Sequence, residues 1–122
     1  MRKLFAAAML AALPLTPLQA QSMPISQFLA KADALKAKGA MAMFSSDLGL
    51  LKKEAGNSGK ALRAEQQAAV KAGRKPPYCM PAKAAINSNE LLAHLRSIPP
   101  AQQRRMSVKD GFASLVRKKY PC

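Results

Sequence analysis

The chain has 122 residues, of which 20 are lysine or arginine and 6 are aspartate or glutamate, so its formal net charge at pH 7 is +14. Aromatic residues make up 5% of the chain and tryptophan is absent, which argues against a reader of single-stranded nucleic acid, since such proteins stack bases on aromatic side chains. A chain of this length is typical of one domain with a small core.

The first residues have the pattern of a secretory signal peptide. Arg2 and Lys3 form a basic start, an apolar run extends from Leu4 to Leu13, and Ala20 supplies a small residue at the expected cleavage site. The apolar run is shorter than the roughly 20 residues that a helix needs to cross a membrane, so we expect no membrane span. The pattern predicts a signal peptide over 1–20, one helical domain over 21–122, and a periplasmic or secreted protein.

The first predicted helix begins near Pro24 and ends at Gly39. Proline suits a first helical turn because its missing N–H would have no partner there, and glycine is favoured just after a helix C-terminus. A short helical turn is expected over 40–44, and Ser45 or Ser46 can cap the next helix. The apolar residues of the first helix recur at helical spacing: Ile25, Phe28, Leu29, Ala32 and Leu35.

Residues 47–72 have a composition that favours helix, interrupted by Gly56 and Gly59. Each glycine costs about 1 kcal/mol in a helix interior, so a break between two helices fits. One long helix whose glycines let another helix approach closely fits as well. We favour the continuous helix, in which several alanines would form a close-packed face: Ala61, Ala64, Ala68, Ala69 and Ala72.

Two capped helices follow the Pro76–Pro77 pair. Asn87 with Glu90 has the spacing of a capping box, and Ser107 with Asp110 has a similar one. Pro99 and Pro100 separate the two helices. The apolar stripes are Leu91, Leu92, Leu95 and Ile98 in the first helix and Val108, Phe112, Leu115, Val116 and Tyr120 in the second. No stretch alternates with period two, so we expect an all-α fold of four or five helices.

The two cysteines, Cys79 and Cys122, bracket this C-terminal helical hairpin. In an exported chain one intramolecular disulfide is favoured, although the residues by themselves also allow a free thiol pair or an intermolecular bond. We therefore expect the hairpin to be closed by one disulfide, which would stabilise a domain with so small a core.

The sequence does not indicate an enzyme or a cofactor site. His94, the one histidine, lies beside the apolar stripe of its helix and is expected to be a structural or surface residue. The acidic residues are scattered, and no pair shares an obvious face for acid–base chemistry. Met41 and Met43 offer thioethers suited to Cu(I), but residues two apart on a helix do not share a face, and methionine more often fills gaps in a core. We expect no bound metal.

The positive charge is the strongest physical signal in the sequence. A field of this sign attracts nucleic acid, anionic lipid or an acidic protein surface, and it also keeps an alanine-rich domain soluble. Export argues against nucleic acid, so a protein partner with an acidic surface is the preferred interpretation.

The C-terminal unit contains a characteristic succession of segments: Cys79-Met80-Pro81, Asn89 to Leu92, Ile98-Pro99-Pro100 followed by Arg104-Arg105, Val108 to Val116, and Tyr120-Pro121-Cys122. This succession resembles the Tai/Rap immunity proteins of bacterial type VI secretion. The resemblance implies a periplasmic, all-helical, often dimeric protein that binds a secreted peptidoglycan amidase and blocks its active site. The residues that correspond are mainly structural, above all the two cysteines.

The turn from Pro99 to Ser107 is the expected contact surface for such a partner, because it joins two adjacent arginines to a loop held by prolines. The residues that we expect to bind the partner are Arg96, Arg104, Arg105 and Lys109. The alternative is a basic envelope protein of the same fold that binds polyanions such as cell-wall polymers or lipid head groups, with salt-sensitive binding.

Overall fold

The computed structural model describes residues 22–122. The predicted signal peptide and its cleavage site lie outside these residues. Five α-helices and one 3-10 helix follow one another, and the described part of the chain contains no β-strand. The elements are α1 (Ile25–Lys38), η1 (Gly39–Phe44), α2 (Ser46–Lys71), α3 (Ser88–Ser97), α4 (Pro100–Gln103) and α5 (Val108–Lys119). The predicted all-α fold is confirmed. Within this range no helix is long and apolar enough to cross a membrane.

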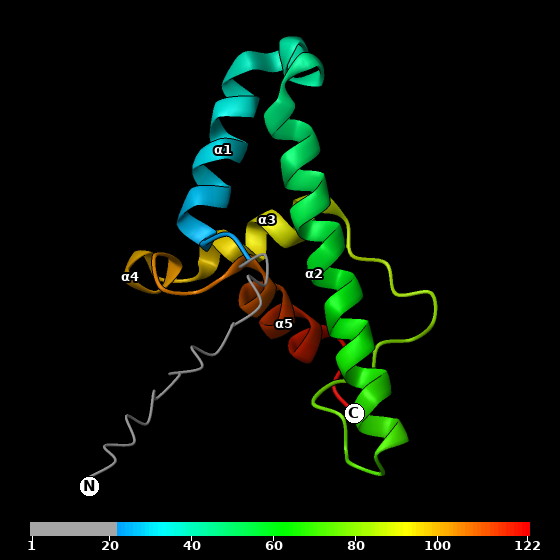
Figure 1. The fold of residues 1–122 in the computed structure, drawn as a ribbon. Helices are drawn as coiled ribbons and strands as arrows, with labels where there is room; N and C mark the ends of the chain where they lie inside the picture. The colour runs from blue at the N-terminus through cyan, green and yellow to red at the C-terminus, as the bar shows by residue number, and fades with distance from the viewer. Residues whose placement is uncertain (1–21) are drawn as a thin grey trace, which may run out of the picture.

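Helices α1 and α2 run antiparallel and are joined at one end of the molecule by η1 (Figure 1). Gly39 has φ +57°, the positive φ expected of a glycine after a helix, and Ser45 caps α2 by accepting a hydrogen bond of 3.3 Å from the N–H of Asp47. Helix α2 is continuous through Gly56 and Gly59, so the choice of one helix over two is confirmed.

The alanine face proposed for α2 is wrong in part. Ala69 is buried, but Ala64, Ala68 and Ala72 are exposed, because α5 and the segment after α2 cover one side of its second half. The inward positions on that side hold larger groups, among them the fully buried Leu62. The spacing of small residues therefore did not identify the packed face.

Helices α3, α4 and α5 lie beyond the end of α1 that is away from η1, beside α2 (Figure 1), and α5 packs most extensively against α2. Asn87 and Ser107 cap α3 and α5 as expected, accepting from the N–H groups of Glu90 and Asp110 at 2.8 and 3.1 Å. The carboxylate of Glu90 does not complete its capping box and instead forms an ion pair with Lys119 at 2.9 Å. Helix α4 is a single turn inside the segment that the sequence marked only as a Pro-Pro turn.

The segments that precede α1 and α5 lie side by side. Ile25 N–H donates to the carbonyl of Met106 at 2.9 Å, and Val108 N–H donates to the carbonyl of Met23 at 2.8 Å. Together these bonds form an isolated antiparallel bridge between Pro24 and Ser107. These bonds hold the N-termini of α1 and α5 together and so set the position of α5 against α1.

The core has two parts. The larger lies between α1, α2, α3 and α5 around Ile25, Leu95 and Val108, each with no exposed surface. The smaller joins the segment after α2 to α2 and α5, around Tyr78 and Val116. Partly buried Ile86 and Phe112 contact both parts.

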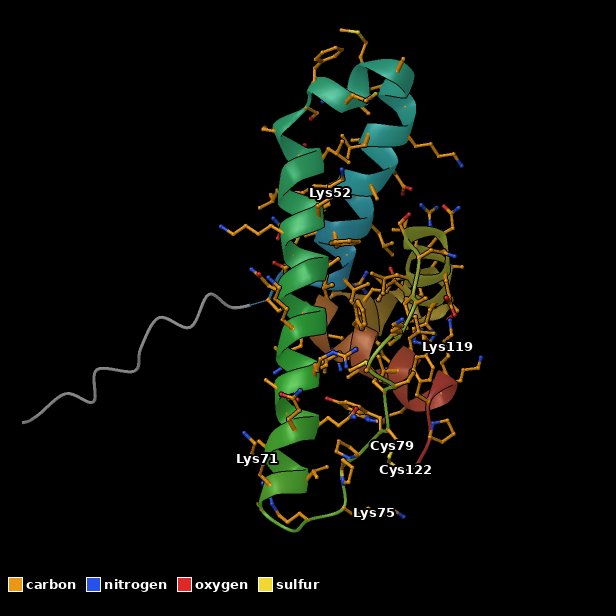
Figure 2. The ribbon with its side chains drawn as sticks, turned by 90° about the vertical axis from the view of Figure 1, so that its right-hand side faces the viewer. Lys52, Lys71, Lys75, Cys79, Lys119 and Cys122 are labelled. Atoms are coloured by element: carbon orange, nitrogen blue, oxygen red, sulfur yellow. A yellow bond between two sulfur atoms is a disulfide. The ribbon has the colours of Figure 1, made fainter. Side chains whose placement is uncertain are left out.

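Cys79 and Cys122 form the predicted disulfide at the end of the molecule where α2 gives way to the following segment (Figure 2). The N–H of Cys79 also donates to the carbonyl of Tyr120 at 2.9 Å, so the chain end is held by a hydrogen bond beside the covalent link. Both cysteine residues are exposed. The disulfide therefore anchors the C-terminus to the segment that follows α2.

Candidate functional site

The predicted contact turn is braced from inside by one side chain. The amide of Gln103 donates to the carbonyls of Leu95 and Ile98 at 3.3 and 2.8 Å, which holds α4 against the end of α3. Arg104 and Arg105 follow α4 directly and are exposed, and neither has an acidic partner among residues 22–122. The turn therefore presents two arginines from a fixed backbone.

The other two predicted partner-binding residues are occupied within the protein. Arg96 of α3 pairs with Asp33 of α1 at 2.8 Å, and Lys109 of α5 pairs with Glu65 of α2. These ion pairs connect helices, so we assign Arg96 and Lys109 to the scaffold. Arg105 and Lys109 do line the same hollow of about 660 Å³, but Glu54 and Asp110 line it too, so the hollow has mixed charge.

The acidic residues of the protein are almost all used internally. Of the six in the sequence, four form ion pairs with lysine or arginine, and Glu54 accepts hydrogen bonds from Ser22 Oγ and the Met23 N–H at 2.7 and 2.6 Å. The sixth, Asp110, lies in the first turn of α5, where the helix dipole favours a negative charge. Most lysines and arginines in the described part of the chain are left without an acidic partner. The surface consequently has a strong excess of positive charge.

An apolar groove of about 650 Å³ lies between α1, α2, α3 and the segment before α3. Its apolar lining includes Leu35, Leu48, Leu92 and Phe112, while Lys52, Lys60 and Arg63 line it from α2. Sequence reasoning missed this groove because its walls come from five segments that are separate in the sequence: α1, α2, the segment before α3, α3 and Phe112 of α5. The one local signal was the helical spacing of the lining positions 52, 56, 59, 60 and 63 on α2.

His94 has a structural contact, as the sequence indicated. Its Nε2 lies 2.6 Å from Ser114 Oγ, and the Ser114 hydroxyl donates to the carbonyl of Gly111 at 2.7 Å. Because a hydroxyl has a single hydrogen, His94 Nε2 is the donor of this pair. Burial lowers the pKa of His94 below its usual value, and the nearby Lys118 lowers it further.

The methionines of residues 22–122 differ in burial. Met80 is buried in the smaller core and fits the expected gap-filling use. Met41 and Met43, with Phe44, project from η1 and are 66%, 79% and 85% exposed, so the core interpretation is wrong for them. The η1 turn is too short to bury both faces. Over residues 22–122 no group of three His, Cys, Asp or Glu side chains is placed to hold a metal ion.

Comparisons of the chain with protein-family models, with curated proteins and with solved structures found no match. The resemblance to the Tai/Rap immunity proteins therefore rests on the C-terminal residues themselves, from Cys79 to Cys122. It remains an interpretation of those motifs.

Proposed function

We propose that this protein is an exported, non-enzymatic binding protein that engages a partner with an acidic surface. The observation that carries the proposal is the internal use of the acidic residues, which leaves Arg104 and Arg105 without partners on a turn braced by Gln103. Following the resemblance of the C-terminal unit, we propose a secreted peptidoglycan amidase as the partner and blocking of its active site as the outcome.

The braced turn suits recognition of a carboxylate-rich surface. Arginine offers five donors in a planar fork that fits carboxylates in a bidentate manner. A fixed backbone lowers the entropy lost when such a contact forms. Positive charge over the rest of the surface would accelerate the encounter with an acidic partner, more strongly at low salt.

A second candidate is a protein that binds polyanions without a single partner. The distribution of the charge favours it, because lysines also occur far from the turn, for example Lys71 and Lys75 near the disulfide end (Figure 2). Binding of this kind depends on counterion release and falls steeply as salt increases, whereas a shape-complementary protein complex retains part of its affinity.

Capture from periplasmic extract, and from cells that express candidate secreted amidases, tests the proposal when the captured material is washed at two salt concentrations. A stoichiometric protein partner that survives the high-salt wash would support it. Diffuse capture that disappears with salt would favour the polyanion alternative.

Charge reversal then locates the contact. We expect Arg104→Glu/Arg105→Glu to weaken the complex at least tenfold, about 1.4 kcal/mol. The matched control is Lys53→Glu/Lys71→Glu, which makes the same change of net charge at exposed positions of α2 without acidic partners. Equal losses in the two variants, or unchanged affinity in the first, would remove the turn as the contact surface.

A further inference from the structure

The apolar groove of about 650 Å³ has the size of a small-molecule site. Pockets for such ligands typically enclose about 300–1,000 Å³ and combine an apolar lining with a few polar groups. Its lining runs along α2 from Leu48 to Arg63, a helical distance of about 22 Å. One acyl chain spans half of a bilayer core, about 15 Å, so the groove is long enough for a single chain.

Two glycines of α2 open this groove. Gly56 and Gly59 both line it, and a Cβ on Gly56 would meet no atom within 4 Å. A Cβ on Gly59 would lie 3.6 Å from Cζ of Phe112, an ordinary contact distance. The glycines are therefore not needed to let another helix approach α2, so this part of the favoured continuous-helix interpretation is wrong. Their effect is to leave space where side chains would otherwise fill the groove.

The charged groups at the groove have one sign. Lys52, Lys60 and Arg63 line it, and no aspartate or glutamate is among its described lining residues. The other hollow of similar volume, by contrast, contains Glu54 and Asp110 beside its cations. Asn87 and Ser88 place the N-terminus of α3 at the groove, which adds a partial positive charge.

Lys60 and Arg63 are three residues apart on α2, so their side chains emerge on the same face. Arg63 Nη2 donates to the carbonyl of Pro81 at 3.2 Å, which holds the guanidinium at the edge of the groove near the segment before α3. The remaining guanidinium donors and the Lys60 ammonium can bind an anionic head there. The apolar lining extends from this end toward Leu48 and Leu35, near the η1 end.

We propose that this groove binds one molecule of a long-chain carboxylate, with the acyl chain along the apolar lining and the carboxylate at Lys60 and Arg63. The charge of the lining selects the anionic head, and the volume and length select a single chain. This site is separate from the Arg104–Arg105 turn, so it does not depend on the proposed protein partner.

Calorimetric titration of the purified, oxidised protein with laurate below its micelle concentration tests the site, with methyl laurate as the uncharged probe. We expect one laurate per chain and an affinity at least tenfold higher for laurate than for methyl laurate. Salt should reduce this difference, because exposed charges are screened. Absence of saturable laurate binding would overturn the proposal.

Two sets of variants locate the ligand. Gly56→Leu should weaken laurate binding at least tenfold by filling the groove, whereas Gly49→Leu should leave it unchanged, because Gly49 is exposed on the same helix and does not line the groove. Lys60→Gln/Arg63→Gln should reduce laurate affinity to that of the methyl ester, while Lys53→Gln/Lys71→Gln should not. The charge variants decide the matter if circular dichroism shows that Gly56→Leu does not fold.

A different occupant would give a different result. Suppose that the protein forms a dimer, that Gly56→Leu abolishes the dimer and that laurate does not bind. The groove is then an interface for a second copy, and the proposal is wrong. Equal loss of laurate affinity in the groove variants and in their controls would also overturn it.

Discussion

The hydroxyl of Tyr78 donates a hydrogen bond of 2.8 Å to the main-chain carbonyl of Leu62, and each of the two residues is only 1% exposed. This bond connects the irregular segment after α2 to the middle of α2 itself. Because the disulfide of Cys79 is adjacent in sequence, the same short segment is tied to α2 by a buried hydroxyl and to the C-terminus by a covalent bond.

Tyr78 should make the protein sensitive to alkali. Burial, together with the neighbouring carboxylate of Glu65, raises the pKa of Tyr78 from 10.0 to about 12. A raised pKa in the folded state means that the contribution to stability is complete below pH 10 and is lost as the pH rises from 10 toward 12. We expect the free energy of unfolding in urea to fall by up to about 3 kcal/mol over this interval through Tyr78.

The variant Tyr78→Phe should remove this part of the pH dependence at the cost of about 1 kcal/mol at neutral pH, since the hydrogen bond to Leu62 is lost. The control is Tyr120→Phe, at the other tyrosine of the chain, which should keep the wild-type slope above pH 10. A wild-type slope in Tyr78→Phe would show that other groups dominate the alkaline transition.

Reduction of the disulfide should cost a large part of the stability. The two cysteines are 43 residues apart in sequence, and the chain-entropy relation for a loop of this size gives about 4 kcal/mol. Both cysteines are exposed, so dithiothreitol should reach the bond in the folded protein. We expect Cys79→Ser/Cys122→Ser to match the reduced protein in urea unfolding. A loss below about 1 kcal/mol in both would mean that the reduced unfolded chain is already restricted.

Gly111 should not tolerate a side chain. A Cβ at this position of α5 would lie 2.5 Å from Cδ2 of Leu95 and 2.8 Å from Cδ1 of Ile25, two residues with no exposed surface. We expect Gly111→Ala to lower the free energy of unfolding by about 1–3 kcal/mol, because neighbours in a filled core cannot move away freely. Gly56→Ala is the matched control and should raise stability by about 1 kcal/mol, since its Cβ meets no atom and alanine favours helix. Gains of stability in both variants would contradict the tight contact between α3 and α5.

His94 should contribute to a loss of stability on mild acidification. Burial and Lys118 lower its pKa, so its neutral form is favoured in the fold. The contribution is complete above the unfolded value of 6.5 and is lost as the pH falls through 6.5 toward the folded pKa. Between pH 7 and pH 5 we expect wild type to lose more stability than His94→Gln. Titration of the imidazole by NMR measures the pKa of His94 and so checks that it is lowered. The variant Lys118→Gln should raise this pKa.

Local sequence patterns predicted every helix except the single turn of α4, with the ends of each predicted helix close to their final positions. The caps at Asn87 and Ser107 lie where their local patterns place them, and α2 ends at Lys71, one residue before the predicted end at Ala72. Capping and helical periodicity act within about four residues, so a single sequence contains all that they need. The disulfide could be predicted for another reason, because the chain has no other cysteines.

Which charges lack a partner and where the groove lies could not be predicted from the sequence, because both depend on contacts between distant segments. Arg96 is paired with an aspartate 63 residues away, and Lys109 with a glutamate 44 residues away, so neither pairing is visible in the local sequence. The groove likewise needs α1, α2, α3, α5 and the segment before α3 in their final places. Ion pairs and cavities between distant segments depend on how helices pack, and the packing of these helices follows from the core around Ile25 and Leu95 and from the bridge between Pro24 and Ser107.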